Sequence, residues 1–142
     1  IYDRLYQILP SHPAAIFLLA GINDISHHLT PREVVNGIFR IVNKISYQCP
    51  DTKICLQSIL PINEAFHQWK LLEGKTETIV EVNSILEKTA NEQKIPFLNL
   101  FPLFTLPGSL VLRPELTIDG LHLTEKGYRI WVTILKKELY LH

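Results

Sequence analysis

A carboxylate and an imidazole stand three residues apart in the segment Asp119-Gly120-Leu121-His122. A carboxylate that accepts the Nδ1 proton of a histidine fixes the imidazole tautomer, raises its basicity and leaves Nε2 free as a general base. One chain turn suffices to bring Asp119 and His122 together, so the pair supplies two thirds of a hydrolytic triad. An Asp-x-x-His match also arises by chance, and the same pair can be a purely structural contact within a loop.

A second segment of interest is Gly21-Ile22-Asn23-Asp24, which directly follows an apolar run. The glycine permits a tight turn, and a side-chain amide presented at a strand end can donate an N–H to a developing oxyanion. Asn23 is therefore a candidate oxyanion donor, with Gly21 forming the turn that presents it. The alternative is that Asn23 and Asp24 are turn formers whose side chains hydrogen-bond to their own backbone.

The elements that must position these segments alternate between strands and helices. The continuous apolar run over residues 14–20 predicts a strand buried on both faces of a parallel sheet, and residues 53–59 and 95–100 are predicted as the second and third strands. Apolar stripes at helical spacing predict helices over residues 2–9, 30–49 and 78–93, and a last helix that Thr124 caps. Thr30-Pro31-Arg32-Glu33 is a capping box with proline at the first helical position.

This alternation is typical of the α/β class, with a parallel sheet and helices on both faces. Ligands bind such sheets at the carboxyl ends of the strands, and both segments of interest lie there in the predicted order of elements. A length of 142 residues corresponds to one domain. The sequence therefore predicts a single α/β domain whose active edge carries both segments.

The composition argues against several classes of function. Fourteen Lys and Arg residues balance fourteen Asp and Glu residues, so the chain lacks the basic field that nucleic acid binding requires. No apolar run approaches the roughly 20 residues needed to cross a bilayer. Cys49 and Cys55 are too few and too close for a disulfide framework, and we expect both to be free thiols.

Two further interpretations use some of the same residues. A hydrolytic metal site is one, because His and carboxylate ligands suit zinc, although the adjacent His27 and His28 do not both turn inward easily. Its candidate ligands are Asp24, His27, His28, Asp119 and His122. The other is a non-catalytic flavodoxin-like binding or phosphoacceptor domain with Asp24 near a strand end, although the supporting acidic pair and late lysine are not evident.

Together, the two segments resemble the third and fifth sequence blocks of the SGNH hydrolases, also called GDSL esterases and lipases, in the expected order. The segments 56–63 (LQSILPIN) and 122–128 (HLTEKGY) are similar to the branch containing platelet-activating-factor acetylhydrolase subunits and bacterial carbohydrate acetylesterases. The resemblance covers the whole chain. It implies a flavodoxin-like serine esterase in which Asp119 and His122 are catalytic, Gly21 and Asn23 belong to the oxyanion hole, and no metal or organic cofactor is needed.

The family's first block, a Gly-Asp-Ser with the nucleophilic serine, has no counterpart among the serines of this sequence, which are Ser11, Ser26, Ser46, Ser58, Ser84 and Ser109. We expect that block, and the first strands of the sheet, upstream of Ile1. Residues 1–142 would then be one N-terminally incomplete SGNH-hydrolase-like domain.

The resemblance also implies a partner, a small soluble ester such as an O-acetyl group on a sugar, with no nucleic acid or membrane. Trp69, with Phe66, His67 and Gln68, is a candidate to line the acyl or sugar pocket. A homo-oligomer is left open. We expect a soluble protein of the periplasm or a secreted one, although the chain itself does not fix the compartment.

Overall fold

The computed structural model describes the backbone of residues 1–141 and the side chains of residues 1–138. Contacts within the chain divide it into two units. The first unit consists of Ile1–Ile59 and Glu77–Asn99, and the second consists of Leu60–Thr76 and the chain from Leu100 onward. Of the two segments of interest, Gly21–Asp24 belongs to the first unit and Asp119–His122 to the second.

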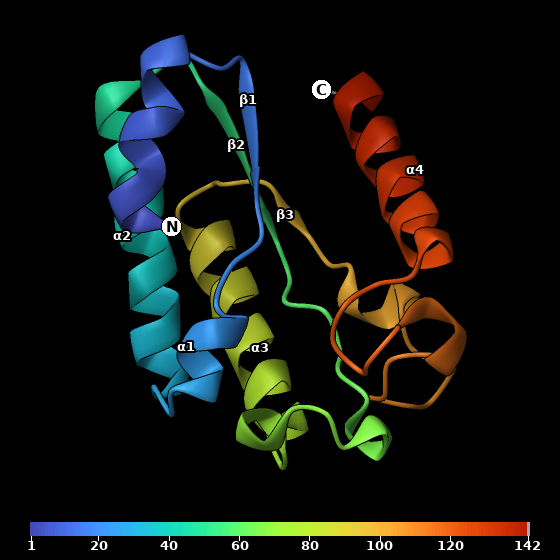
Figure 1. Cartoon of the computed structure of the whole chain (residues 1–142). Coiled ribbons are helices and arrows are strands. Elements are labelled where there is room, and N and C mark those ends of the chain that lie inside the picture. Colours follow the sequence, from blue (N-terminus) through green and yellow to red (C-terminus); the bar gives the residue numbers. More distant parts are fainter. Residues whose placement is uncertain (142) are drawn as a thin grey trace. The chain divides into compact units, whose positions relative to one another are not determined.

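The first unit is built around a three-stranded parallel sheet (Figure 1). Its strands are β1 (Ala15–Leu18), β2 (Lys53–Gln57) and β3 (Phe97–Leu98), in the order β1-β2-β3. Ala15 lies opposite Lys53 in the first pair, and Leu56 lies opposite Phe97 in the second. The predicted α/β class with a parallel sheet is confirmed.

The strands are shorter than the apolar runs that predicted them, and β1 is not buried on both faces. Three of its four residues are only half-buried, because β1 forms an edge of the described sheet and has a neighbouring strand on one side only. The apolar residues after β1 instead continue into the loop that contains Gly21.

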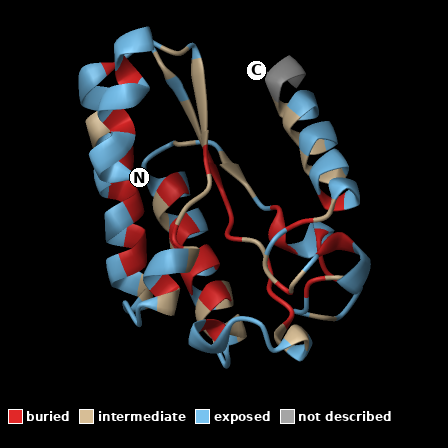
Figure 2. Ribbon diagram, in the orientation of Figure 1, coloured by how far each residue is buried: buried red, intermediate tan, exposed pale blue. Residues whose placement is uncertain are grey.

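Two long helices connect the strands of the first unit, α2 (Pro31–Gln48) and α3 (Thr76–Glu92). The capping box at the start of α2 is confirmed, since Thr30 Oγ1 accepts from the Glu33 N–H and the Glu33 carboxylate accepts from the Thr30 N–H. Figure 2 shows the buried residues of α2 gathered along one side of the helix. Apolar side chains of both helices and of β2 and its following loop form the core: Val34, Ile38, Val42, Ile45, Leu56, Ile59, Ile79, Val82 and Leu86.

The prediction of an α-helix over residues 2–9 is wrong. The segment forms two short 3₁₀ helices, Tyr2–Gln7 and Leu9–Ser11. Only Leu5 and Leu9 are buried, whereas Ile8, which the predicted apolar face required, is 49% exposed. No side chain caps the first turn, and Pro10 follows at once, so an α-helix has neither the capping nor the packing that would stabilise it.

The second unit contains one long helix, α4 (Glu125–Leu141), and extended loops. The loops are interrupted by four 3₁₀ turns, Glu64–Phe66, Lys70–Leu72, Phe101–Leu103 and Pro114–Leu116. Two isolated antiparallel bridges, Thr105 to Leu112 and Thr117 to Leu123, tie the loops together. Phe104, Leu112 and Leu116 are fully buried. This unit carries its polar residues on loops that are themselves held by buried side chains and backbone hydrogen bonds.

Both cysteines are free thiols, as predicted; Cys49 is buried and Cys55 is half-buried. Among the helices of residues 1–141, none combines the length and the hydropathy that a membrane span requires.

Candidate active site

The structure brings Asp119 and His122 into direct contact. Asp119 Oδ2 lies 2.7 Å from His122 Nδ1. The other carboxylate oxygen, Oδ1, accepts the backbone N–H groups of Leu121, at 3.0 Å, and of His122, at 2.8 Å. The carboxylate therefore has a fixed orientation, because three donors from the following residues of its own loop hold it.

These contacts decide the charge of Asp119. Partial burial alone would raise its pKa, but the hydrogen bonds from His122 and Leu121 outweigh that effect and lower the pKa from the ordinary 3.8 to about 2. An ionised carboxylate only accepts hydrogen bonds, so Nδ1 of His122 carries a proton and Nε2 is the nitrogen with a free lone pair. The His122 side chain is 59% exposed, which leaves Nε2 accessible from outside the loop.

The loop that carries the pair is fastened to the segment that begins at Asn63. The Asn63 N–H donates to the carbonyl of Gly120 at 2.8 Å, and Thr117 Oγ1 accepts the N–H of Gly120 at 2.9 Å. Gly120 has a φ of +91°, and a Cβ at this position would collide with the Asn63 carbonyl oxygen. Only glycine therefore fits between Asp119 and His122 at this point.

Asn63 is a buried residue whose importance the sequence did not reveal. Its Nδ2 donates to the carbonyl of Leu112 at 2.9 Å, and its Oδ1 accepts the N–H of Ala65 at 3.1 Å. Together with the backbone bond to Gly120, these contacts join three separate parts of the second unit. A buried amide with both polar atoms paired is costly to remove, so Asn63 supports the geometry of the loop that carries Asp119 and His122.

Trp69 lies against His122. The two ring centroids are 5.2 Å apart, with an angle of 64° between the planes, an edge-to-face arrangement. The indole remains 41% exposed. It also lines a small hollow together with His67, Gln68 and Glu73. Phe66 lies beside Gly120 instead. A Cβ added to Gly120 would come within 3.2 Å of the Phe66 Cβ.

In the first unit, the turn after β1 is formed by Gly21, whose φ is +118°, and by the short helix α1 (Ile22–Ser26). The carbonyl of Asn23 accepts hydrogen bonds from Ser26 Oγ at 2.7 Å and from the backbone N–H of His27 at 3.0 Å, and His27 Nδ1 lies 2.6 Å from it. The backbone of Asn23 is therefore well fixed. Its side-chain carboxamide, by contrast, makes no hydrogen bond within residues 1–138, whose side chains are described.

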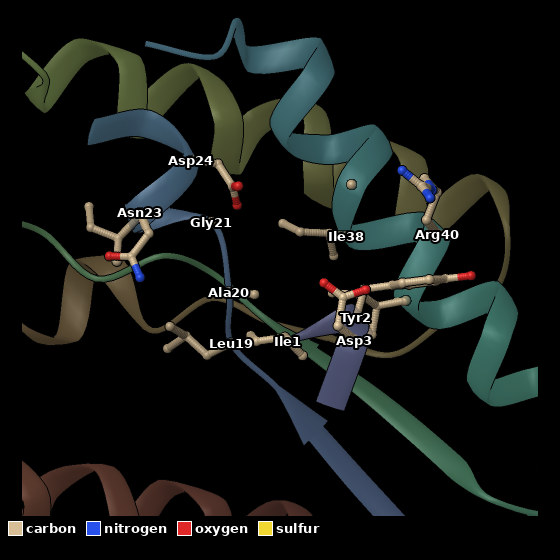
Figure 3. A pocket seen from close by; sticks show the side chains of 13 residues that line it. Ile1, Tyr2, Asp3, Leu19, Ala20, Gly21, Asn23, Asp24, Ile38 and Arg40 are labelled. Carbon is tan, nitrogen blue, oxygen red and sulfur yellow. The ribbon is translucent and has the colours of Figure 1, made fainter. Parts of the chain in front are cut away.

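Asn23 lines an open pocket of about 460 Å³ within the first unit (Figure 3). Gly21, Asp24 and Arg40 also line this pocket, and the side chains of Asn23 and Asp24 project in different directions from the turn. The interpretation of Asn23 as a residue that hydrogen-bonds its own turn through its side chain does not describe this structure. Its amide is exposed and available to a ligand.

The metal-site interpretation finds no set of ligands. Across residues 1–141, His, Cys, Asp and Glu side chains form no group of three or more that could hold a metal ion. His27 already contacts the Asn23 carbonyl through Nδ1, and Nδ1 of His122 is occupied by Asp119.

Comparison with solved structures agrees with the observed fold. A Streptococcus pneumoniae protein whose structure is named for platelet activating factor is 34% identical, with a TM-score of 0.80; the match covers 89% of this chain and 59% of that one. A GDSL-like lipase from Bacteroides thetaiotaomicron is 24% identical with a TM-score of 0.85, over 98% of this chain and 68% of that one. An acetyl xylan esterase is 21% identical with a TM-score of 0.74, over 96% of this chain and 73% of that one.

This chain thus spans less than two thirds of the Streptococcus protein. No curated protein matches it. The sequence model of the GDSL-like lipase/acylhydrolase family matches residues 1–130, which is most of the chain. The protein described here belongs to the GDSL-like lipase/acylhydrolase family.

Proposed function

We propose that the protein is a serine esterase that hydrolyses small acyl esters, with His122 as the general base and Asp119 as the residue that orients it. The observation that carries the proposal is the 2.7 Å contact between Asp119 Oδ2 and His122 Nδ1, beside an exposed Nε2, in a member of an acylhydrolase family. Family membership also disfavours the alternative of a non-catalytic phosphoacceptor domain.

In this mechanism, Nε2 of His122 removes the hydroxyl proton of a nucleophilic serine while the serine oxygen bonds to the ester carbonyl carbon. The imidazolium then donates that proton to the alcohol oxygen as the C–O bond breaks, which leaves an acyl-enzyme. Water repeats the sequence and releases the acid. We assign the nucleophile to a Gly-Asp-Ser block upstream of Ile1, and to none of the serines in this chain; Ser58, for example, is fully buried.

Asn23 is proposed to donate its side-chain N–H to the oxyanion, with Gly21 forming the turn that presents it. The support is local. The Asn23 backbone is held by Ser26 and His27, its carboxamide has no partner among residues 1–138, and it lines a pocket. A donor that is not engaged elsewhere can turn toward the oxyanion without breaking an existing hydrogen bond.

For the substrate, we propose an acetyl ester, and an O-acetylated carbohydrate as the natural alcohol. The support comes from similar structures, which include the acetyl xylan esterase and a carbohydrate esterase family 3 member from Talaromyces cellulolyticus, 17% identical with a TM-score of 0.72. A neutral chain without a basic surface excess is also suited to an uncharged ester.

The direct test is hydrolysis of p-nitrophenyl acetate by the full-length protein and its His122→Ala variant. Loss of the general base is expected to lower kcat by about 10³-fold or more. His28→Asn is a matched control, because it removes an exposed imidazole from a position with a φ of +62°, which asparagine also tolerates. Undiminished turnover in His122→Ala would falsify the assignment.

A further inference from the structure

The hydroxyl of Thr117 bridges two points of the loop that carries Asp119 and His122. Its oxygen accepts the N–H of Gly120 at 2.9 Å, and its proton is donated to the carbonyl of His122 at 2.8 Å. A hydroxyl has a single proton, so these two bonds use its donor and one of its acceptor positions. Thr117 is only 5% exposed. The hydroxyl therefore joins the two points at a place where water competes little for either bond.

The two points are the backbone on either side of the proposed catalytic contact. Gly120 directly follows Asp119, and the carbonyl belongs to the residue that carries the imidazole. The chain reverses direction here, and the N–H of Ile118 also donates to the His122 carbonyl at 2.9 Å. The spacing between these parts of the backbone determines whether Asp119 Oδ2 meets His122 Nδ1 at 2.7 Å. The hydroxyl thus acts on the carboxylate and the imidazole through the backbone that carries them.

Loss of the hydroxyl affects the two points unequally. The His122 carbonyl would keep the N–H of Ile118, whereas the N–H of Gly120 would lose its bond at a buried position, which is unfavourable. Glycine adopts many backbone conformations at little cost, so hydrogen bonds rather than its own sterics keep Gly120 at a φ of +91°. Without the hydroxyl, the turn between Asp119 and His122 is held less firmly.

From these contacts we infer that Thr117 is a positioning residue of the esterase, and that its hydroxyl holds the loop in the conformation in which Asp119 and His122 meet. The inference rests on the proposed function. A displacement of about 1 Å at a reacting group can cost on the order of 10²-fold in rate. Because Thr117 is buried, its hydroxyl does not itself bind the ester. The loss is therefore expected in kcat and not in KM.

The test measures kcat and KM for p-nitrophenyl acetate with full-length variants that lack or keep the hydroxyl. Thr117→Val preserves the size and the β-branching of threonine, and it should lower kcat about 30-fold with KM within about twofold of wild type. Thr117→Ser keeps the hydroxyl and should retain kcat within about threefold. Urea denaturation gives the folded fraction of each variant, and the rates are expressed per folded molecule.

Thr105→Val is the matched control. Thr105 is another buried threonine of the second unit, and its hydroxyl donates to the carbonyl of Pro102 at 3.3 Å. The variant should leave kcat unchanged even if it lowers the free energy of unfolding as much as Thr117→Val does. If Thr117→Val does not fold, Thr117→Ala takes its place, because the smaller side chain lets water reach the N–H of Gly120. A loss of kcat of about tenfold or more is then expected.

A second comparison uses the Asp119→Asn background. There Thr117→Val should change kcat by less than about threefold, because the charged contact that the hydroxyl supports is already gone. A full 30-fold loss in that background overturns the assignment, since the hydroxyl would then act elsewhere. The assignment is also overturned by a kcat for Thr117→Val close to that of wild type, by an equal loss in Thr117→Ser, or by a loss confined to KM.

Failure of this inference is distinct from failure of the proposed function. If the wild-type protein does not hydrolyse the ester, or if His122→Ala keeps its rate, the proposed function itself fails. A rate that depends on His122 but not on the Thr117 hydroxyl rejects only the role of Thr117.

Discussion

The turn at Gly21 and the loop at Gly120 use the same device under different constraints. Both glycines have positive φ values, +118° and +91°, and each lies within two residues of a proposed functional side chain. A Cβ at Gly21 would meet the ends of two side chains, Ile59 Cδ1 and Val34 Cγ1, each at 2.9 Å, whereas a Cβ at Gly120 would meet the backbone carbonyl of Asn63. Side-chain ends can rotate away, but a carbonyl in a fastened loop cannot. The Gly120 loop is thus the less adaptable of the two.

The proposed functional side chains of the two segments also differ in how firmly they are held. The Asp119 carboxylate accepts three hydrogen bonds, and its orientation is determined before any substrate arrives. The Asn23 carboxamide neither accepts nor donates a hydrogen bond among the described side chains and backbone of residues 1–138, although the Asn23 backbone is fixed. The proposed base is therefore held in place by its own loop, whereas the final orientation of the proposed oxyanion donor depends on the ligand.

The largest expected effect concerns the proposed general base. Asp119→Asn removes the charge that keeps the proton on Nδ1 of His122, so we expect kcat/KM for p-nitrophenyl acetate to fall by about 10³- to 10⁴-fold. Steady-state kinetics of the full-length variant provide the measurement. Turnover within a few-fold of wild type would mean that the Asp119 contact is structural rather than catalytic.

Asn23→Ala should have the next largest effect. An N–H that interacts mainly with the oxyanion lowers kcat by about 10²- to 10³-fold while KM changes little. Asn43→Ala is a matched control, because it removes an exposed amide of α2 that does not line the pocket. A change confined to KM would instead assign Asn23 to ground-state binding.

Replacing each of the two glycines with alanine tests which segment tolerates an added Cβ better. Gly120→Ala should lower the free energy of unfolding by about 3 kcal/mol or more, because backbone strain adds to a collision with a carbonyl. Gly21→Ala should cost about 2 kcal/mol, since Ile59 and Val34 can repack. Urea denaturation of both variants measures the two losses of unfolding free energy. A larger loss for Gly21→Ala would show that the Gly21 turn is the less adaptable segment.

The smallest expected effect is a change in the free energy of unfolding with pH. Because the folded pKa of Asp119 is about 2, below its ordinary 3.8, the unfolded chain takes up this proton first as the pH falls. The stabilisation from this group is present above pH 4 and is lost toward pH 2, by up to about 2 kcal/mol. The difference in unfolding free energy between wild type and Asp119→Asn should narrow over that range. A constant difference would show that the carboxylate contacts do not stabilise the fold.

Much of the first unit could be predicted from the sequence because its signals are local. The residues that form the capping box at Thr30 lie within a few positions of one another, and so do successive residues of the apolar stripe of α2. The apolar run at 14–20 correctly located a strand, but an apolar run does not reveal which strand lies at an edge. The prediction of an α-helix over residues 2–9 failed because the burial of Ile8 depends on tertiary packing rather than on spacing.

In the second unit, the contact between Asp119 and His122 could be predicted from the sequence for the same reason, since the two residues are three positions apart. The hydrogen bond of Asn63 to Gly120 and the ring contact of Trp69 with His122 were not, because more than 50 residues separate the partners in each case. The sequence pointed to Trp69 as a pocket residue without indicating its partner. Asn63 appeared only as one letter of a family-like segment, and its role follows from burial.

The closeness of the Trp69 indole to His122 has an optical consequence. A protonated imidazole quenches the emission of an adjacent indole by accepting an electron from its excited state, whereas a neutral imidazole does so weakly. The emission of Trp69 therefore reports on changes at His122, such as its replacement by alanine, without any added dye. Trp131 is the other tryptophan of this sequence, and replacing it with phenylalanine leaves Trp69 as the single reporter within these 142 residues.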